Sequence, residues 1–296
     1  MTIAELIDAS ADALDAAGVA FGHGTTNAYD EAAWLVLWRL GLPLDSALDG
    51  PDAVAHRHVD AAAAQRVREL VQQRITSRKP AAYLTGEAWL QGVAFDVDER
   101  CIVPRSLIAE LLASGTLDAW MPAQAHRLLD LCTGGASLAI LAALAWPQLQ
   151  VDAADIAPEA LEVARLNLQR HGLTERIRLL RGDGLAAADG RYDMILCNPP
   201  YVNSASMARL PAEYQAEPAL ALAGGIDGMD FVRALMRDAP AYLQPHGALV
   251  LEIGHERGFF EAAFPTAAAL WLTTSAGSDQ VCLLTRDALR ALPPIP

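Results

Sequence analysis

Cysteine, basic residues and long apolar runs are all scarce in this chain, and each shortage excludes a class of protein. The four cysteines are far apart and form no CxxC pair, so we expect neither a metal site nor a disulfide framework. No apolar run approaches the roughly 20 residues that a bilayer-spanning helix needs, and no basic cluster opens the chain. The sequence therefore predicts a soluble, cytoplasmic protein without membrane contact.

The shortage of basic residues leaves a formal net charge of −14, from 22 lysines and arginines against 36 aspartates and glutamates. A field of this sign repels the phosphate backbone of nucleic acids and attracts basic partners. We therefore expect no direct sequence-specific binding of nucleic acid.

Hydrophobic residues are plentiful, at 53% of 296 residues, which suits one large domain and one smaller domain. Apolar residues recur at helical spacing through residues 1–78, which predicts a small all-α domain. Residues 79–105 contain two strand-like runs, 83–86 and 93–97, and are interpreted as a β-hairpin linker. Residues 106–296 are assigned to an α/β catalytic domain.

This α/β domain is predicted from strands that alternate with helices. The predicted elements are helices at 107–117, 138–146, 158–171 and 231–243 and strands at 127–132, 150–155, 176–181, 192–197, 248–253, 270–274 and 281–285. Continuous apolar strands of this kind are typical of a mostly parallel sheet that helices cover on both faces.

The first strand of this domain ends in a turn with two glycines that leads directly into a helix. Gly134 and Gly135 let the backbone approach a ligand closely, and the helix N-terminus offers unpaired N–H groups. In a doubly wound sheet this crevice binds ligands, although a tight structural turn is the alternative. Asp130, just before the turn, is placed either to hold an amino group of the ligand or to satisfy backbone donors.

Two further aspartates follow the next strands. Asp155 lies 21 residues after Gly134, which matches the roughly 20-residue interval to an acid that binds a ribose hydroxyl. A helix N-cap is the alternative role, because Pro158 begins the following helix. Asp183 lies between two glycines, and beside the other signals it is expected to bind an adenine amino group rather than only to form a turn.

The strand at 192–197 delivers Asn198-Pro199-Pro200-Tyr201 to the same edge of the sheet. Two prolines fix φ and remove N–H donors, so the segment is rigid and rich in acceptors. The Asn198 carboxamide oxygen and the Pro199 carbonyl can each accept one N–H of a substrate –NH2 group, and Tyr201 can pack on a planar group. Such acceptors favour a tetrahedral nitrogen over a planar one. The segment therefore predicts methyl transfer to a planar nitrogen rather than a turn that only ends a strand.

These motifs, in this order, resemble those of the protein-(glutamine-N5) methyltransferases. The resemblance extends over essentially the whole chain and is carried by residues 130–136, 155–161, 198–201, 217–218 and 224–228. It implies a Rossmann-like class I fold with a seven-stranded sheet, S-adenosyl-L-methionine as the methyl donor, and a glutamine side-chain amide as the acceptor. The implied cofactor site comprises Asp130, Thr133, Gly134, Gly135, Asp155, Ile156, Asp183 and Asn198.

Several segments resemble one branch of that family. Residues 23–27, 83–89 and 97–106, with Cys132 in place of a motif glycine, are similar to the branch that modifies the large-subunit ribosomal protein L-three. A basic protein of this kind fits the acidic charge. The helical domain then either recognises the substrate or only shields the catalytic domain. Arg105 and Glu217 are candidates for the substrate cleft, with a structural ion pair or a loop anchor as the alternative.

The loop departs from the family pattern at two positions. Ala136 stands where family members commonly have glycine, and Gly135 where they have serine or threonine, so we expect the methyl group at 136 to crowd the ligand or to shift the loop.

Three other functions stay open. They are glutamine methylation of peptide release factors, adenine-N6 methylation of nucleic acid, and partner binding without turnover in ribosome assembly. The acidic charge disfavours the second, and the intact residues 198–201 disfavour the third.

Overall fold

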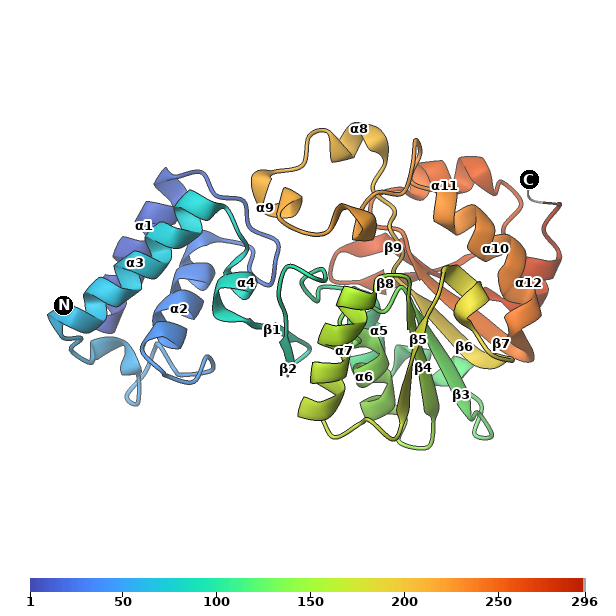
Figure 1. Ribbon diagram of the computed structural model, residues 1–296, viewed down its shortest axis with the longest axis horizontal. Coiled ribbons are helices and arrows are strands. Elements are labelled where there is room, and N and C mark those ends of the chain that lie inside the picture. Colours follow the sequence, from blue (N-terminus) through green and yellow to red (C-terminus); the bar gives the residue numbers. More distant parts are fainter. Residues whose placement is uncertain (295–296) are drawn as a thin grey trace. The chain divides into compact units, whose positions relative to one another are not determined.

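The computed structural model describes residues 1–294, and the chain divides into two compact units (Figure 1). The helical unit consists of Met1–Ala88 together with Leu210–Glu217, and the sheet unit consists of Trp89–Arg209 and the chain from Pro218 onward. The helical unit is therefore discontinuous in sequence. Within residues 1–294, no helix is both long enough and apolar enough to cross a membrane.

The helical unit is built around three long helices whose first turns are capped by side chains. Its elements are α1 (Ile3–Ala16), α2 (Ala28–Arg39), η1 (Val54–His56), α3 (Ala61–Ser77), α4 (Ala81–Thr85) and α9 (Ala212–Gln215). Thr2, Asn27 and Asp60 each accept a hydrogen bond from the backbone N–H three residues later. These bonds satisfy donors that have no partner within the helix. The apolar stripes of α1, α2 and α3 form one buried core.

Residues 83–86, predicted from the sequence as a strand, instead end helix α4. This helix begins after Pro80 and ends at Gly86, whose φ of 73° is left-handed. Ala81 is fully buried in the helical core, so packing overrides the strand preference of the residues that follow. The hairpin consists of β1 (Glu87–Leu90) and β2 (Val93–Asp96).

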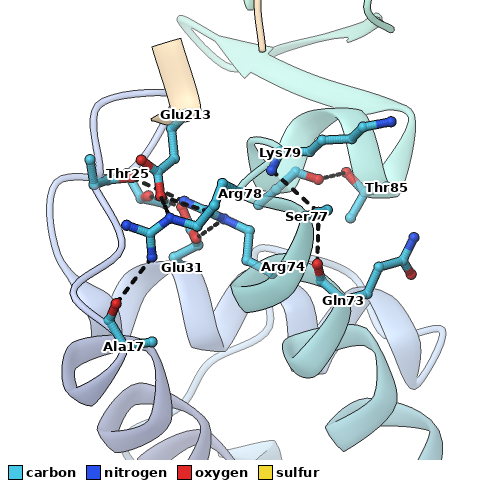
Figure 2. A network of polar contacts seen from close by, with 12 residues as sticks. Ala17, Thr25, Glu31, Gln73, Arg74, Ser77, Arg78, Lys79, Thr85 and Glu213 are labelled. Carbon is cyan, nitrogen blue, oxygen red and sulfur yellow. Dashed lines mark hydrogen bonds and ion pairs between the residues drawn. The ribbon is translucent and has the colours of Figure 1, made fainter. Parts of the chain in front are cut away.

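The segment Leu210–Glu217 joins the helical unit through a buried cluster of charged side chains (Figure 2). Arg74, on α3, is fully buried, and its Nε lies 2.7 Å from Glu31 Oε1 while its Nη1 lies 3.3 Å from Glu213 Oε1. Arg78 Nε lies 3.0 Å from the same Glu213 oxygen. Burial raises the pKa of Glu31, and the charge of Arg74 opposes that rise. Two buried carboxylates are thus matched by two guanidinium groups.

The sheet unit contains a seven-stranded sheet in the order β5-β4-β3-β6-β7-β9-β8. Its strands are β3 (Arg127–Leu131), β4 (Gln150–Asp155), β5 (Ile177–Arg181), β6 (Tyr192–Cys197), β7 (Leu243–Glu252), β8 (Leu270–Thr274) and β9 (Gly277–Thr285). Strands β3 to β7 pair in parallel, and β9 pairs antiparallel with both β7 and β8. The predicted mostly parallel sheet is confirmed.

Helices cover both faces of this sheet (Figure 1). One face packs against α5 (Ile108–Ala113), α6 (Ser137–Ala145) and α7 (Pro158–Arg170), and the other against α10 (Asp230–Tyr242), α11 (Arg257–Ala263) and α12 (Arg286–Arg290). Successive strand residues enter opposite cores, as Leu128 and Leu129 do. The short helices η2 (Thr116–Trp120), η3 (Gly184–Ala187), α8 (Ser204–Met207) and η4 (Ala219–Ala221) lie in the connections.

Three predicted boundaries differ from the structure by more than one residue. The helix predicted at 107–117 ends at Ala113, because Gly115 has a left-handed φ of 70° before η2 begins. Strands β7 and β9 begin earlier than predicted, at Leu243 and Gly277.

Candidate active site

A cleft lies at the carboxyl ends of β3, β4, β5 and β6 in the sheet unit. Parallel pairing of these four strands brings the loops that follow them to one edge. Of the residues predicted from the sequence, the cleft is lined by Gly134, Asp155, Ile156, Asp183, Asn198 and Pro200. Segments far apart in the sequence therefore meet where the ligand crevice was expected.

Asp130 supports the glycine loop from its buried side. Its Oδ2 accepts a hydrogen bond from the Thr133 hydroxyl and another, at 3.0 Å, from the Ala139 N–H, while Oδ1 has no partner within residues 1–294. Burial raises the pKa of this carboxyl to about 7 although both hydrogen bonds lower it. Asp130, Thr133 and Gly135 do not line the cleft, so their contact with a cofactor stays a prediction.

Ala136 adds no bulk to the cleft. Its φ of 65° lies in the left-handed region, which costs an L-residue about 1–2 kcal/mol, but its methyl group is fully buried in the core beneath the loop. The expected crowding of the ligand is therefore not observed. At Gly135, an added Cβ would lie 3.4 Å from both Asn167 Nδ2 and Cys101 Sγ, so this position has little room for a side chain.

Asp155, at the end of β4, connects the glycine loop to the start of α7. Its Oδ2 accepts the Gly134 N–H and its Oδ1 accepts the Ala157 N–H, each at 2.9 Å. The N-cap residue of α7 is Ala157, which makes no side-chain cap, so Asp155 does not fill the N-cap position. Burial raises the pKa of Asp155, and these N–H groups oppose the rise. A carboxylate has about four acceptor sites, so Asp155 can still bind ribose hydroxyls.

The far part of the cleft combines one acid with apolar side chains. Asp183, at the start of η3, lines it together with the half-exposed Ile156 and with Phe231 from α10. This combination suits a planar heterocycle with an amino group. Phe231 and Leu220 were not predicted from the sequence, because an apolar residue carries no local signal that separates a residue lining a cleft from a residue of the core.

Asn198 and Pro200 bring the end of β6 into the cleft. The Asn198 side chain is partly exposed, and its carboxamide has no hydrogen-bond partner in the described part of the chain. Pro199 is buried between them. The carboxamide of Asn198 is therefore available to a substrate.

Tyr201 is fixed by close approach of three glycines. A Cβ at Gly224 would lie 2.7 Å from Tyr201 Cα, and one at Gly254 would lie 2.6 Å from its ring, while one at Gly228 would overlap its carbonyl oxygen. Val202, the next residue, forms a β-bridge with Ala223. Ala223, Gly224 and Gly228 thus hold the Asn-Pro-Pro-Tyr segment in one position.

The two charged candidates for the substrate cleft have different surroundings. Glu217 is buried in the helical unit, and its Oε2 lies 3.3 Å from Nε2 of His23, which favours the loop-anchor alternative. Arg105 Nη1 donates to the Val103 carbonyl at 3.1 Å and is partly exposed. A substrate contact by Arg105 stays a prediction.

Comparison with known proteins first identifies the class of protein to which this fold and this cleft belong. Residues 110–214 match the family model described as the methyltransferase small domain. The hMettl16 catalytic domain, solved in complex with the MAT2A 3′UTR hairpin 1, superposes with a TM-score of 0.50 at 14% identity, covering 80% of this chain and 84% of that one. At this identity the likeness concerns the fold alone. With its sheet order and cleft, this chain is a Rossmann-like class I methyltransferase.

Relatives across nearly the whole chain define the family. Proteins named ribosomal protein uL3 glutamine methyltransferase are 54% identical in Bordetella pertussis, 48% in Burkholderia pseudomallei and 45% in Neisseria meningitidis serogroup B. The alignments cover 97%, 98% and 97% of this chain and 96%, 96% and 94% of the relatives. The chain belongs to the ribosomal protein uL3 glutamine methyltransferase family.

Proposed function

We propose that this chain transfers a methyl group from S-adenosyl-L-methionine to the side-chain amide nitrogen of a glutamine in ribosomal protein uL3. The observation that carries the proposal is the available Asn198 carboxamide, which lies in the same cleft as Asp155. Membership of the family supports the choice of acceptor.

The residues of the cleft fit this methyl donor. Ile156 and Phe231 offer apolar surface to adenine, and Asp155 offers acceptors to ribose. Oδ1 of Asp130, to which no group in residues 1–294 donates, suits an amino group nearby. When bound, the donor supplies an electrophilic methyl group on its sulfonium sulfur.

The acceptor is a difficult nucleophile, because the lone pair of an amide nitrogen is delocalised into the carbonyl. Asn198 Oδ1 and the Pro199 carbonyl each accept one N–H of that amide, which stabilises the tetrahedral nitrogen of the transition state over the planar ground state. The two prolines keep these acceptors in place, so alignment costs little entropy. The methylated nitrogen then releases its proton to solvent, and no strong base is needed.

The same proposal assigns the remaining contacts. Tyr201 and Arg105 contact the substrate beside the glutamine, and the helical residues 1–78 recognise the rest of the protein, with 79–105 as the linker. The net charge of −14 favours encounter with a basic substrate. Since ribosomal proteins are made in the cytoplasm, we place the reaction there.

The test is methyl transfer from labelled S-adenosyl-L-methionine to purified uL3, a peptide release factor and ribosomal RNA in parallel. Label on uL3, mapped to a glutamine, is the expected result. Label only on the release factor would show that the release factor is the substrate. Label only on RNA would overturn the glutamine amide as the acceptor in favour of an adenine. Tight binding to uL3 without label would indicate an assembly factor.

A further inference from the structure

Ile226 is the most exposed large hydrophobic side chain in the described part of the chain. It is 87% exposed, and the next is Leu220, at 59%. Both lie in the connection between the Asn-Pro-Pro-Tyr segment and α10, and Leu220 lines the cleft. An isoleucine kept in water forgoes about 1.5–3 kcal/mol of burial, part of which a partner that covers the side chain would recover.

The turn that carries Ile226 is held on both sides by hydrogen bonds. The Ser204 N–H and hydroxyl both donate to the Gly225 carbonyl at 2.9 Å. On the other side, Asp227 pairs with Arg233, which holds the pKa of that carboxyl below its usual range, and it accepts the Met229 N–H at 3.1 Å. Ile226 is therefore presented by a rigid turn rather than by a loose one.

The turn also lies beside the acceptor segment. Gly224 packs so closely that an added Cβ would lie 2.8 Å from the Pro200 carbonyl oxygen. Ile226 is two residues further along, and two residues span at most about 7 Å between Cα atoms. Its side chain is thus within reach of a polypeptide whose glutamine contacts Asn198.

We propose that Ile226 is a docking contact for an apolar side chain next to the methylated glutamine in the substrate polypeptide. This inference rests on the proposed function. A second copy of the chain is a poor occupant, because a stable dimer buries about 800 Å² on each partner and one isoleucine offers far less. A polypeptide already held at Asn198 needs only a small additional contact.

The test is steady-state kinetics of Ile226→Ser with uL3 as substrate. We expect KM for uL3 to rise about tenfold, which corresponds to about 1.4 kcal/mol of lost binding. The kcat and the dissociation constant of S-adenosyl-L-methionine should stay unchanged, and Ile226→Leu should keep the original KM. The matched control is Leu144→Ser, because Leu144 is 49% exposed near the end of α6, which runs away from the cleft edge.

The outcomes separate this inference from the function itself. If wild-type protein does not methylate uL3, the proposed function fails. If wild-type protein is active and Ile226→Ser keeps its KM, the docking contact is refuted while the function stands. A weaker cofactor affinity in Ile226→Ser would also overturn it, by placing Ile226 at the cofactor. A dimer of wild-type protein that this substitution dissociates would assign the residue to self-association.

Discussion

At the residue scale, the proposed function assigns different roles to Asn198 and Asp155, which lie at one edge of the sheet. The Asn198 carboxamide is available to a substrate, whereas both carboxylate oxygens of Asp155 already bind backbone N–H groups. The Asn198 carboxamide is therefore suited to a substrate that binds and is released in each turnover. The Asp155 carboxylate shapes the loop and lines the cleft. The two positions therefore predict different kinetic defects.

Replacing Asn198 by alanine should lower kcat about 10²–10³-fold, the usual loss when one preorganised polar group is removed from a transition state. The dissociation constant of S-adenosyl-L-methionine should change little. Single-turnover kinetics and calorimetry measure the two quantities separately. A kcat equal to that of the wild type would remove Asn198 from the reaction.

Replacing Asp155 by alanine should act on cofactor binding instead. Loss of hydrogen bonds to a charged group weakens binding by about 1.5–3 kcal/mol, or roughly tenfold to a hundredfold. Calorimetric titration with S-adenosyl-L-methionine gives the dissociation constant directly. If that constant is the same as in the wild type, Asp155 only ties Gly134 to Ala157.

Asp130 predicts a dependence of stability on pH. Its carboxyl has a pKa of about 7 in the folded protein, raised mainly by burial from an ordinary value of 3.8. The folded state therefore holds this proton more tightly, and its contribution to stability, complete below about pH 4, is lost as the pH rises to 7. The slope is at most about 1.4 kcal/mol per pH unit.

Urea unfolding of the wild type and of Asp130→Asn across this range measures the effect. The free energy of unfolding of the wild type should fall relative to that of the variant as the pH rises. If the free energies of unfolding of the two proteins change in parallel with pH, the raised pKa of Asp130 is contradicted.

The sequence predicts the position of site residues that directly follow a strand, but it does not predict the position of residues in the longer connections. Asp155 and Asn198 follow apolar strands, so topology alone brings them to one edge. Glu217 has the same polar character, yet it is buried against His23, nearly two hundred residues earlier in the chain. Its position depends on long-range packing, which leaves no local pattern.

At the element scale, the buried cluster around Arg74 decides how the segment with α9 is held. Arg74→Met removes one charge and leaves Glu31 and Glu213 buried with only Arg78 to compensate. Breaking a buried pair in this way costs about 3–5 kcal/mol. Urea unfolding of the full-length protein should detect the loss.

The matched control for Arg74→Met is Arg237→Met, whose pair with Asp238 is exposed. It should leave the unfolding curve unchanged, because exposed pairs are screened by water. Equal losses in both variants would show that the buried cluster contributes nothing specific.

At the element scale too, the predicted limits of a strand match the structure where turn residues bound its apolar run. Strands β4, β6 and β8 have the predicted limits, whereas β7 extends five residues toward the N-terminus, through Leu243-Gln244-Pro245-His246-Gly247. Proline and glycine in that stretch are typical turn residues, and of its five residues only Leu243 pairs with β6, opposite Tyr192, before the register shifts. Local composition cannot report such pairing.

At the scale of the whole molecule, the excess of acidic residues should make substrate capture sensitive to salt. Raising ionic strength screens the attraction between this chain and a basic protein, so KM for uL3 should rise several-fold between about 0.05 and 0.3 M salt. An uncharged glutamine peptide is the control, since its KM should not respond. A KM for uL3 that is independent of salt would leave the net charge without a role in capture.

The discontinuous helical unit has a consequence for exchanging parts between relatives. Leu210–Glu217 folds together with Met1–Ala88. A chimera joined only at residue 88 would therefore combine the N-terminal helices of one protein with residues 210–217 of another. Glu213 and Glu217 would then face foreign partners in place of Arg74 and His23. Transplanting the helical unit within this family therefore requires two grafts in the same chimera, one at the N-terminus and one between α8 and η4.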